Sequence, residues 1–215
     1  MHAELIDALR CPAAHADSWL VAMATRTVDR DLLEGTLGCP VCRAEYPLAG
    51  GVVRFATPAP PTPLPVPFAR LGEETALRLA ALLDLTDARG VALLLGAWGA
   101  LAPAVQEISP ARLLLLDPPA GVPLGSGTCA MEAGTVVPLA TGSVHAAAID
   151  AAHGAAGQVE GVVRAVRAGG RIVAPVSVGV PAGVAEIARD DAVWVGAKEA
   201  VASPVVLLER KSNGH

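Results

Sequence analysis

The chain has 215 residues, of which 53% are hydrophobic, 17% are charged and 3% are aromatic. This composition excludes a disordered chain, because it supplies enough apolar side chains for a core built from alanine, valine and leucine. The net charge of −5 argues against a nucleic acid as the main ligand. Glycines and a proline interrupt the most apolar stretch, residues 90–105, and the N-terminus has acidic residues where a signal peptide is basic. We therefore expect a cytoplasmic protein without a membrane span.

The first segment, residues 1–55, contains a candidate metal site. Cys39 and Cys42 form a Cys-x2-Cys pair, and Cys11 and His15 form a second pair upstream. Two such pairs supply the four ligands of a tetrahedral, structural zinc ion, and the gap between them is long enough for a strand hairpin. A segment this short needs a metal or a disulfide, and thiols that are kept reduced in the cytoplasm favour the metal.

Three strings surround these cysteines: LIDALRCP at residues 5–12, LGCPVC at 37–42 and EYPL at 45–48. They resemble a small zinc-ribbon family that includes the activator subunit of tRNA and protein methyltransferases. The first pair of that family is normally Cys-Pro-x-Cys, whereas Ala14 stands at the second cysteine position here. Three alternatives follow: His15 completes the zinc site, the ribbon has lost its metal, or the second cysteine pair performs redox chemistry.

The second segment, residues 68–215, follows a proline-rich linker at residues 56–67. Its apolar residues have a helical spacing over 73–85, and fully apolar runs predict buried strands at 91–95 and 112–116. Further predicted elements are a helix at 100–108, a strand at 144–149, a helix at 158–167, a strand at 171–176, and strands at 192–195 and 205–209 that form a hairpin. This alternation predicts an α/β fold with a mostly parallel, Rossmann-like sheet and a terminal antiparallel hairpin.

A candidate cofactor site lies between the first two of these strands. Gly96 and Gly99 form a turn after the first strand, and Asp117 ends the second. This is the order of a dinucleotide-type unit, in which glycines admit the ligand and the acid binds a ribose hydroxyl. The alternatives are a plain tight turn at the glycines and an exposed turn acid at Asp117.

Three longer strings of the second segment are LLLGAWG at residues 93–99, VPLATGSVH at 137–145 and VRAVRAGGRIV at 163–173. In order and spacing they resemble the class I S-adenosylmethionine-dependent methyltransferases. The resemblance implies S-adenosylmethionine as the ligand of the candidate cofactor site. Three features depart from the family: the first strand lacks its final acid, Trp98 occupies the glycine loop, and an acid expected near residue 133 is absent unless Glu132 replaces it.

These departures favour a methyltransferase-like protein with a weakened or lost S-adenosylmethionine site. Such a protein would be a binding, scaffolding or accessory protein. It would bind a protein partner or a second copy of itself. One alternative is an active methyltransferase on a small molecule or a protein side chain, and another is a regulator that binds the cofactor or its product without turnover. We assign no catalytic residue, although Asp150 and His153 follow the fourth strand, where a base could lie.

Overall fold

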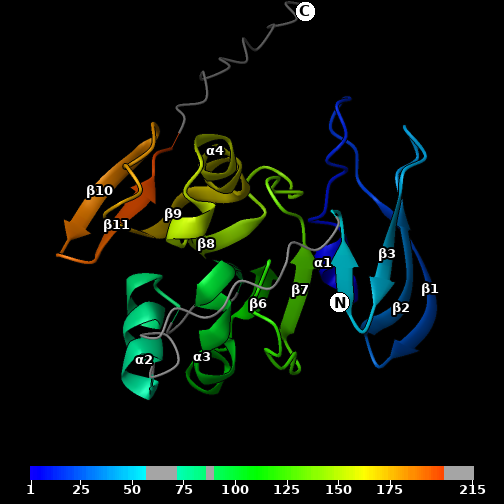
Figure 1. Cartoon of the computed structure of the whole chain (residues 1–215), viewed down its shortest axis with the longest axis horizontal. Helices are drawn as coiled ribbons and strands as arrows, with labels where there is room; N and C mark the ends of the chain where they lie inside the picture. The colour runs from blue at the N-terminus through cyan, green and yellow to red at the C-terminus, as the bar shows by residue number, and fades with distance from the viewer. Residues whose placement is uncertain (57–71, 86–89, 201–215) are drawn as a thin grey trace, which may run out of the picture.

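The computed structural model of the chain describes residues 1–56, 72–85 and 90–200 (Figure 1). In the first segment its elements are α1 (Ala3–Ile6), β1 (Val21–Val28), β2 (Asp31–Gly38), β3 (Glu45–Ala49) and β4 (Val52–Arg54). The helical elements of the second segment are α2 (Glu73–Leu82), η2 (Gly96–Leu101), α3 (Ala102–Ile108), η3 (Ala151–His153) and α4 (Ala156–Ala165). Its strands are β5 (Val91–Leu95), β6 (Arg112–Leu116), β7 (Thr128–Glu132), β8 (Val144–Ala148), β9 (Val166–Pro175), β10 (Val184–Arg189) and β11 (Val193–Lys198).

These strands join one sheet in the order β1-β2-β3-β4-β7-β6-β5-β8-β9-β11-β10. Strands β5 to β9 run parallel to one another, and the order β7-β6-β5-β8-β9 is the 3-2-1-4-5 order of a Rossmann fold. Strand β11 lies antiparallel between β9 and β10. The predicted fold class, with a mostly parallel sheet in the second segment and an antiparallel hairpin after it, is confirmed.

The predicted hairpin strands need a correction. The strand expected at 192–195 is β11, but its hairpin partner is β10, which precedes it in the chain. The other expected strand, residues 205–209, lies outside the described residues. Strand β10 was missed because it is an edge strand with five of its six residues exposed, so it lacks an apolar run. Strand β7 was also missed, although it is almost completely buried.

Apolar side chains cover both faces of the central strands. Along β5, Leu94 packs in a cluster with Leu79 of α2 and Val105 of α3, which lie together in Figure 1. Its neighbour Leu93 points to the opposite face and packs in a second cluster with Val162 of α4. Successive side chains of a strand point to opposite faces of the sheet, and apolar clusters cover both faces. This explains why β5 and β6 are continuous apolar runs in the sequence.

The first segment extends the sheet of the second. Its strands form an antiparallel meander, and Gly50 and Gly51, both at positive φ, make the tight turn between β3 and β4. Strand β4 then pairs in parallel with β7, and Arg54 forms an ion pair with Glu132 at 2.8 Å. The predicted linker, residues 56–67, lies outside the described residues except for its first residue. In the described ranges, no helix has the length and apolarity needed to cross a membrane.

Candidate functional site

The four predicted metal ligands lie together beside the first segment's strands. Cys11 and His15 precede β1, and Cys39 and Cys42 follow β2, so the β1–β2 hairpin brings the two pairs to one end. Their ligand atoms all lie within 4.8 Å of one another; Cys11 Sγ is 3.6 Å from Cys42 Sγ and 3.2 Å from His15 Nε2. In a tetrahedron with Zn–S bonds of about 2.3 Å, sulfur atoms are about 3.8 Å apart. The cluster therefore has the donor set and the spacing for a zinc ion.

The backbone orients the imidazole of this cluster. His15 Nδ1 lies 2.6 Å from the carbonyl oxygen of Ala16, while Nε2 faces the sulfur atoms of Cys11 and Cys39. If Nδ1 donates its proton to that carbonyl, the lone pair of Nε2 is directed into the cluster, as metal-bound histidines require. The Ala16 carbonyl and the Cys11 thiol also raise the pKa of His15.

Backbone N–H groups favour a thiolate at Cys39. Burial raises the pKa of this thiol, but the N–H groups of Cys42 and Val41, together with the thiols of Cys42 and Cys11, outweigh burial and lower the pKa to about 6. A thiolate is the form in which cysteine binds a metal. Tyr46 is a contact that sequence reasoning missed: its hydroxyl lies 3.2 Å from Cys11 Sγ. The only sequence signal for Tyr46 is its place in the EYPL string.

The predicted cofactor residues lie at the carboxyl ends of the parallel strands. The strand order reverses between β5 and β8, and open α/β sheets bind ligands in the crevice at such a point. Gly96, at φ +53, follows β5, and Asp117 follows β6. The loop after β8 brings Asp150 and His153 to the same place. We call the place where these four residues meet, Gly96, Asp117, Asp150 and His153, the crevice.

Two side chains occupy the space beside Gly96. Asp150 Oδ2 accepts a hydrogen bond from the backbone N–H of Ala97 at 2.8 Å, and Asp150 Oδ1 is 2.5 Å from His153 Nδ1. A Cβ atom added to Gly96 would overlap the Asp150 carboxylate and would lie 2.6 Å from His153 Cε1. The glycine therefore makes room for the protein's own carboxylate and imidazole.

The other two predicted cofactor residues also contact the protein itself. Asp117 Oδ1 accepts the backbone N–H of Ala133 at 2.8 Å. A Cβ atom on Gly99 would lie 3.0 Å from Cβ of Pro118, so the turn after β6 packs against this glycine. Asp117 Oδ2 is buried with no hydrogen-bond partner in the described part of the chain, 3.7 Å from His153 Nε2.

The crevice holds one imidazole between two carboxylates. Burial lowers the pKa of His153, but the carboxylates of Asp117 and Asp150 outweigh burial and raise it to about 9. Burial raises the pKa of Asp150, whereas the contact with His153 and the N–H of Ala97 lower it, with a net decrease. At neutral pH the structure therefore contains an imidazolium flanked by carboxylates.

Trp98 and Glu132 are the other residues that sequence analysis placed near a cofactor. The indole N–H of Trp98 donates to the carbonyl of Ile149 at 3.0 Å, which turns the ring toward the end of β8. Glu132, considered as a replacement for a missing acid, forms the ion pair with Arg54 that joins the two segments.

Two grooves are lined in part by residues of α4. One, of about 530 Å³, runs between α4 and residues 178–182, and the second, of about 680 Å³, separates the Cys/His cluster from α4. The predicted cofactor residues Gly96, Gly99 and Asp117 are not among the described residues that line either groove.

No family model matches the sequence, and no curated protein is significantly similar to it. Solved structures do match. A Methanococcus maripaludis protein provisionally described as an S-adenosyl-L-methionine-dependent methyltransferase is 12% identical, covering 64% of this chain and 89% of its own, with a TM-score of 0.49. The N-methyltransferase NodS from Bradyrhizobium japonicum is 13% identical, with coverages of 62% and 98% and a TM-score of 0.42. A T. thermophilus 16S rRNA methyltransferase is 19% identical, with coverages of 60% and 41% and a TM-score of 0.35.

Proposed function

We propose that this chain is a methyltransferase-like protein whose S-adenosylmethionine site is weakened or lost and which acts as a binding, scaffolding or accessory protein. One observation carries the proposal: the Asp150 carboxylate holds the N–H of Ala97 and, with His153, fills the space beside Gly96. A ligand that approaches the backbone of the glycine loop, as in dinucleotide-binding folds, needs that same space.

The electrostatics of the crevice make these side chains hard to displace. Asp150 is only 9% exposed, and it pairs with the imidazolium of His153. Separating a buried ion pair leaves uncompensated charges and costs about 3–5 kcal/mol. Because each 1.4 kcal/mol changes a dissociation constant about tenfold, a ligand that displaces Asp150 loses at least about a hundredfold in affinity.

In the first segment we propose a structural zinc ion held by Cys11, His15, Cys39 and Cys42. Four protein ligands leave no open position for catalysis, so the ion would stabilise the fold rather than take part in a reaction. The fit of the ligand atoms supports this assignment. The need for reduced thiols supports a cytoplasmic location.

A protein partner or a second copy of the chain is the binding partner that we propose, and a nucleic acid is not its main ligand. Trp19, Val21 and Met23 are 66%, 58% and 67% exposed, and they lie before and along β1, at one edge of the sheet. Exposed apolar side chains at a sheet edge suit contact with another polypeptide.

An active methyltransferase is the second candidate, and one observation favours it. Asp117 Oδ2 is buried and lacks a hydrogen-bond partner among the described residues, so it could accept a hydroxyl group of a ligand. Binding would then require the imidazole of His153 to move away.

Calorimetry of the full-length chain with S-adenosylmethionine and with S-adenosylhomocysteine separates the two candidates. We expect no saturable binding below about 1 mM for either compound. A dissociation constant below about 100 μM for either one contradicts the lost site and favours the active methyltransferase.

A further inference from the structure

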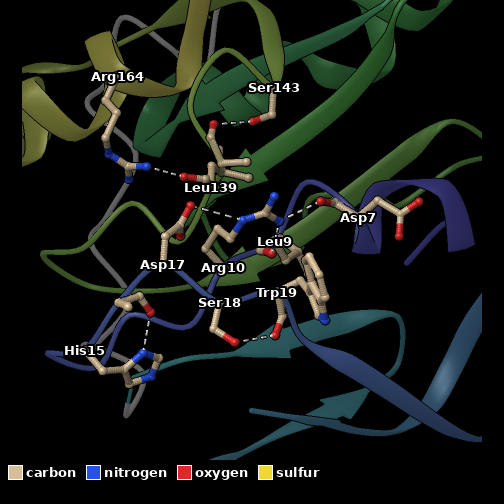
Figure 2. A network of polar contacts seen from close by, with 12 residues as sticks. Asp7, Leu9, Arg10, His15, Asp17, Ser18, Trp19, Leu139, Ser143 and Arg164 are labelled. Atoms are coloured by element: carbon tan, nitrogen blue, oxygen red, sulfur yellow. Dashed lines mark hydrogen bonds and ion pairs between the residues drawn. The ribbon is translucent and has the colours of Figure 1, made fainter. Parts of the chain in front are cut away.

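The segment that carries Cys11 and His15 meets the second segment along a line of backbone contacts, which we call the seam. Figure 2 shows side chains that lie around it. The seam consists of residues 8–10 on one side and residues 138–140 on the other. Its contacts are an isolated antiparallel bridge between Leu9 and Leu139, a hydrogen bond from Arg10 N–H to Pro138 O at 2.9 Å, and one from Ala140 N–H to Ala8 O at 2.7 Å. Two parts of the chain more than 125 residues apart are thus paired as short strands.

Arg10 connects the seam to the metal ligands. It directly precedes Cys11, and its guanidinium donates to the Asp7 carbonyl at 2.7 Å and lies 3.4 Å from the Asp17 carboxylate (Figure 2). Next to it, the N–H of Cys11 donates to the carbonyl of Ser18 at 3.0 Å. The loop that carries Cys11 and His15 is therefore anchored to the seam at both of its ends.

Arg164 of α4 holds the opposite side of the seam. Its guanidinium donates to the carbonyl of Leu139 at 2.5 Å (Figure 2) and to that of Val137 at 2.9 Å. Its own carbonyl accepts the N–H of Gly142 at 3.0 Å. Residues 137–142 are therefore clamped between α4 and the segment that enters the metal cluster.

The groove of about 680 Å³ lies along the seam. Cys11 and His15 line one wall, and Val137, Pro138 and Gly161 line the opposite region. Because the walls belong to the two sides of the seam, the shape of the groove depends on how firmly the seam is held. A metal ion would join Cys11 and His15 to Cys39 and Cys42, and would add bonds across the cluster to the hydrogen bonds and the ion pair that already hold this loop.

We propose that metal binding at the Cys/His cluster closes the seam and thereby sets the shape of this groove, so that the cluster controls residues 137–142 of the second segment. This inference rests on the metal site of the proposed function and adds a regulated element to it. Coupling is reciprocal: if the ion stabilises the closed seam by a given factor, opening the seam completely lowers the metal affinity by that same factor.

Amide hydrogen exchange, measured by NMR on the full-length chain, tests the proposal. After removal of zinc with a chelator, we expect the amides of Arg10 and Ala140 to exchange at least about tenfold faster, because their acceptors lie across the seam. The amide of Val195 in β11 serves as an internal control and should change by less than about twofold. If the chain binds zinc and chelation leaves Ala140 unchanged, the coupling is overturned while the metal site stands. If the chain binds no zinc at all, the metal site and the coupling are both overturned.

A variant tests the same coupling without touching the metal ligands. Arg164→Met removes the guanidinium that holds Val137 and Leu139. Arg167→Met is the matched control, because the exposed side chain of Arg167 forms no hydrogen bond or ion pair with any described residue. In zinc-loaded Arg164→Met we expect faster exchange at Ala140 and a zinc affinity that is weaker by at most the factor at which zinc protects Ala140 in the original chain. Equal zinc affinity and equal Ala140 protection in the two variants overturn the proposal.

Discussion

The carboxylate of Asp150 contacts three groups at the crevice. Oδ2 accepts the N–H of Ala97, and Oδ1 contacts both the imidazole and the backbone N–H of His153. The same oxygen atoms therefore close the first turn of η3 and fix the glycine loop after β5. Such a residue contributes to stability through several groups that would otherwise be buried without partners.

Replacing Asp150 tests this role. We expect Asp150→Ala to lower the free energy of unfolding by about 3 kcal/mol, because it leaves the N–H of Ala97 without its acceptor and leaves the imidazolium of His153 with only Asp117, at 3.7 Å. Urea denaturation measures the change. Asp191→Ala, which removes an exposed carboxylate, is the control and should lie within about 0.5 kcal/mol of the original chain. A loss of less than about 1 kcal/mol at Asp150 contradicts the geometry described here.

The pH dependence of stability tests the charge of His153. Its pKa rises from 6.5 to about 9 on folding, so its contribution is fully present below pH 6.5 and is lost as the pH rises toward 9. The shift corresponds to about 3 kcal/mol. We expect the difference in unfolding free energy between the original chain and His153→Gln to shrink by about that amount between about pH 6 and pH 10. A difference that is independent of pH would show that His153 is not an imidazolium.

Sequence reasoning placed Gly96 and Asp117 after neighbouring strands, because apolar runs mark the strand ends. It did not predict what fills the space between them. The contact between Ala97 and Asp150 joins residues 53 positions apart, and no local pattern records it. The direction of Trp98 was open for the same reason, because the carbonyl of Ile149 that receives its N–H lies at the end of another strand.

At the scale of elements, helix α4 packs closely against the loop that contains Val137. Gly161 faces Val137, and a Cβ atom there would lie 3.0 Å from Cβ of Val137, whereas Gly157 has nothing within 4 Å. The two glycines lie one helical turn apart, yet only one of them is required by packing. The sequence predicts the helix from its apolar spacing but does not distinguish the two glycines.

The same substitution at these two positions should have opposite effects. Gly157→Ala should stabilise the protein by about 0.5 kcal/mol, because alanine favours the helix and meets no atom. Gly161→Ala should destabilise it by about 1 kcal/mol, because the added methyl group crowds Val137. Thermal unfolding of the pair measures the contrast, and equal effects would contradict the close packing of α4 on residue 137.

Strand prediction succeeded for β5 and β6 at the centre of the sheet, but it missed the exposed edge strand β10 and also β7, although β7 is buried. The apolar runs of β5 and β6 gave correct bounds, since neither face of these strands meets water. Among the described strands, β10 pairs with β11 alone, and its exposed side chains include Glu186 and Arg189, which pair with each other. Edge strands are specified by their partners more than by their own sequence.

For the whole molecule, the two segments share one sheet and one apolar cluster. Leu37 and Tyr46 of the first segment belong to the same cluster as Leu93 and Val162 of the second. The division of the chain at a proline-rich linker stays a prediction, but β4 covers the edge of β7 and removes an open strand edge. Composition alone could not show this pairing, because residues 52–54 pair with β7, a strand that lies far along the chain.

Metal removal should affect this joined structure as a whole. We expect one zinc ion per chain by elemental analysis, and a clear fall in the midpoint of thermal unfolding after chelation. Cys42→Ser should lose the zinc, and the exposure of Cys42 keeps its direct packing cost small. Cys129→Ser serves as a comparison for zinc content, because Cys129 lies outside the cluster. Equal zinc content in the two variants would exclude Cys42 as a ligand.

The side chains of Asp150 and His153 fill the space beside Gly96, and we propose that they keep S-adenosylmethionine out of it. The most direct test is a titration of the ¹⁵N-labelled full-length chain with S-adenosylmethionine, followed at the backbone amides of Gly96, Ala97 and Asp117. We predict that these signals stay in place up to about 1 mM ligand. Saturable shifts of all three amides at lower concentrations would contradict the claim.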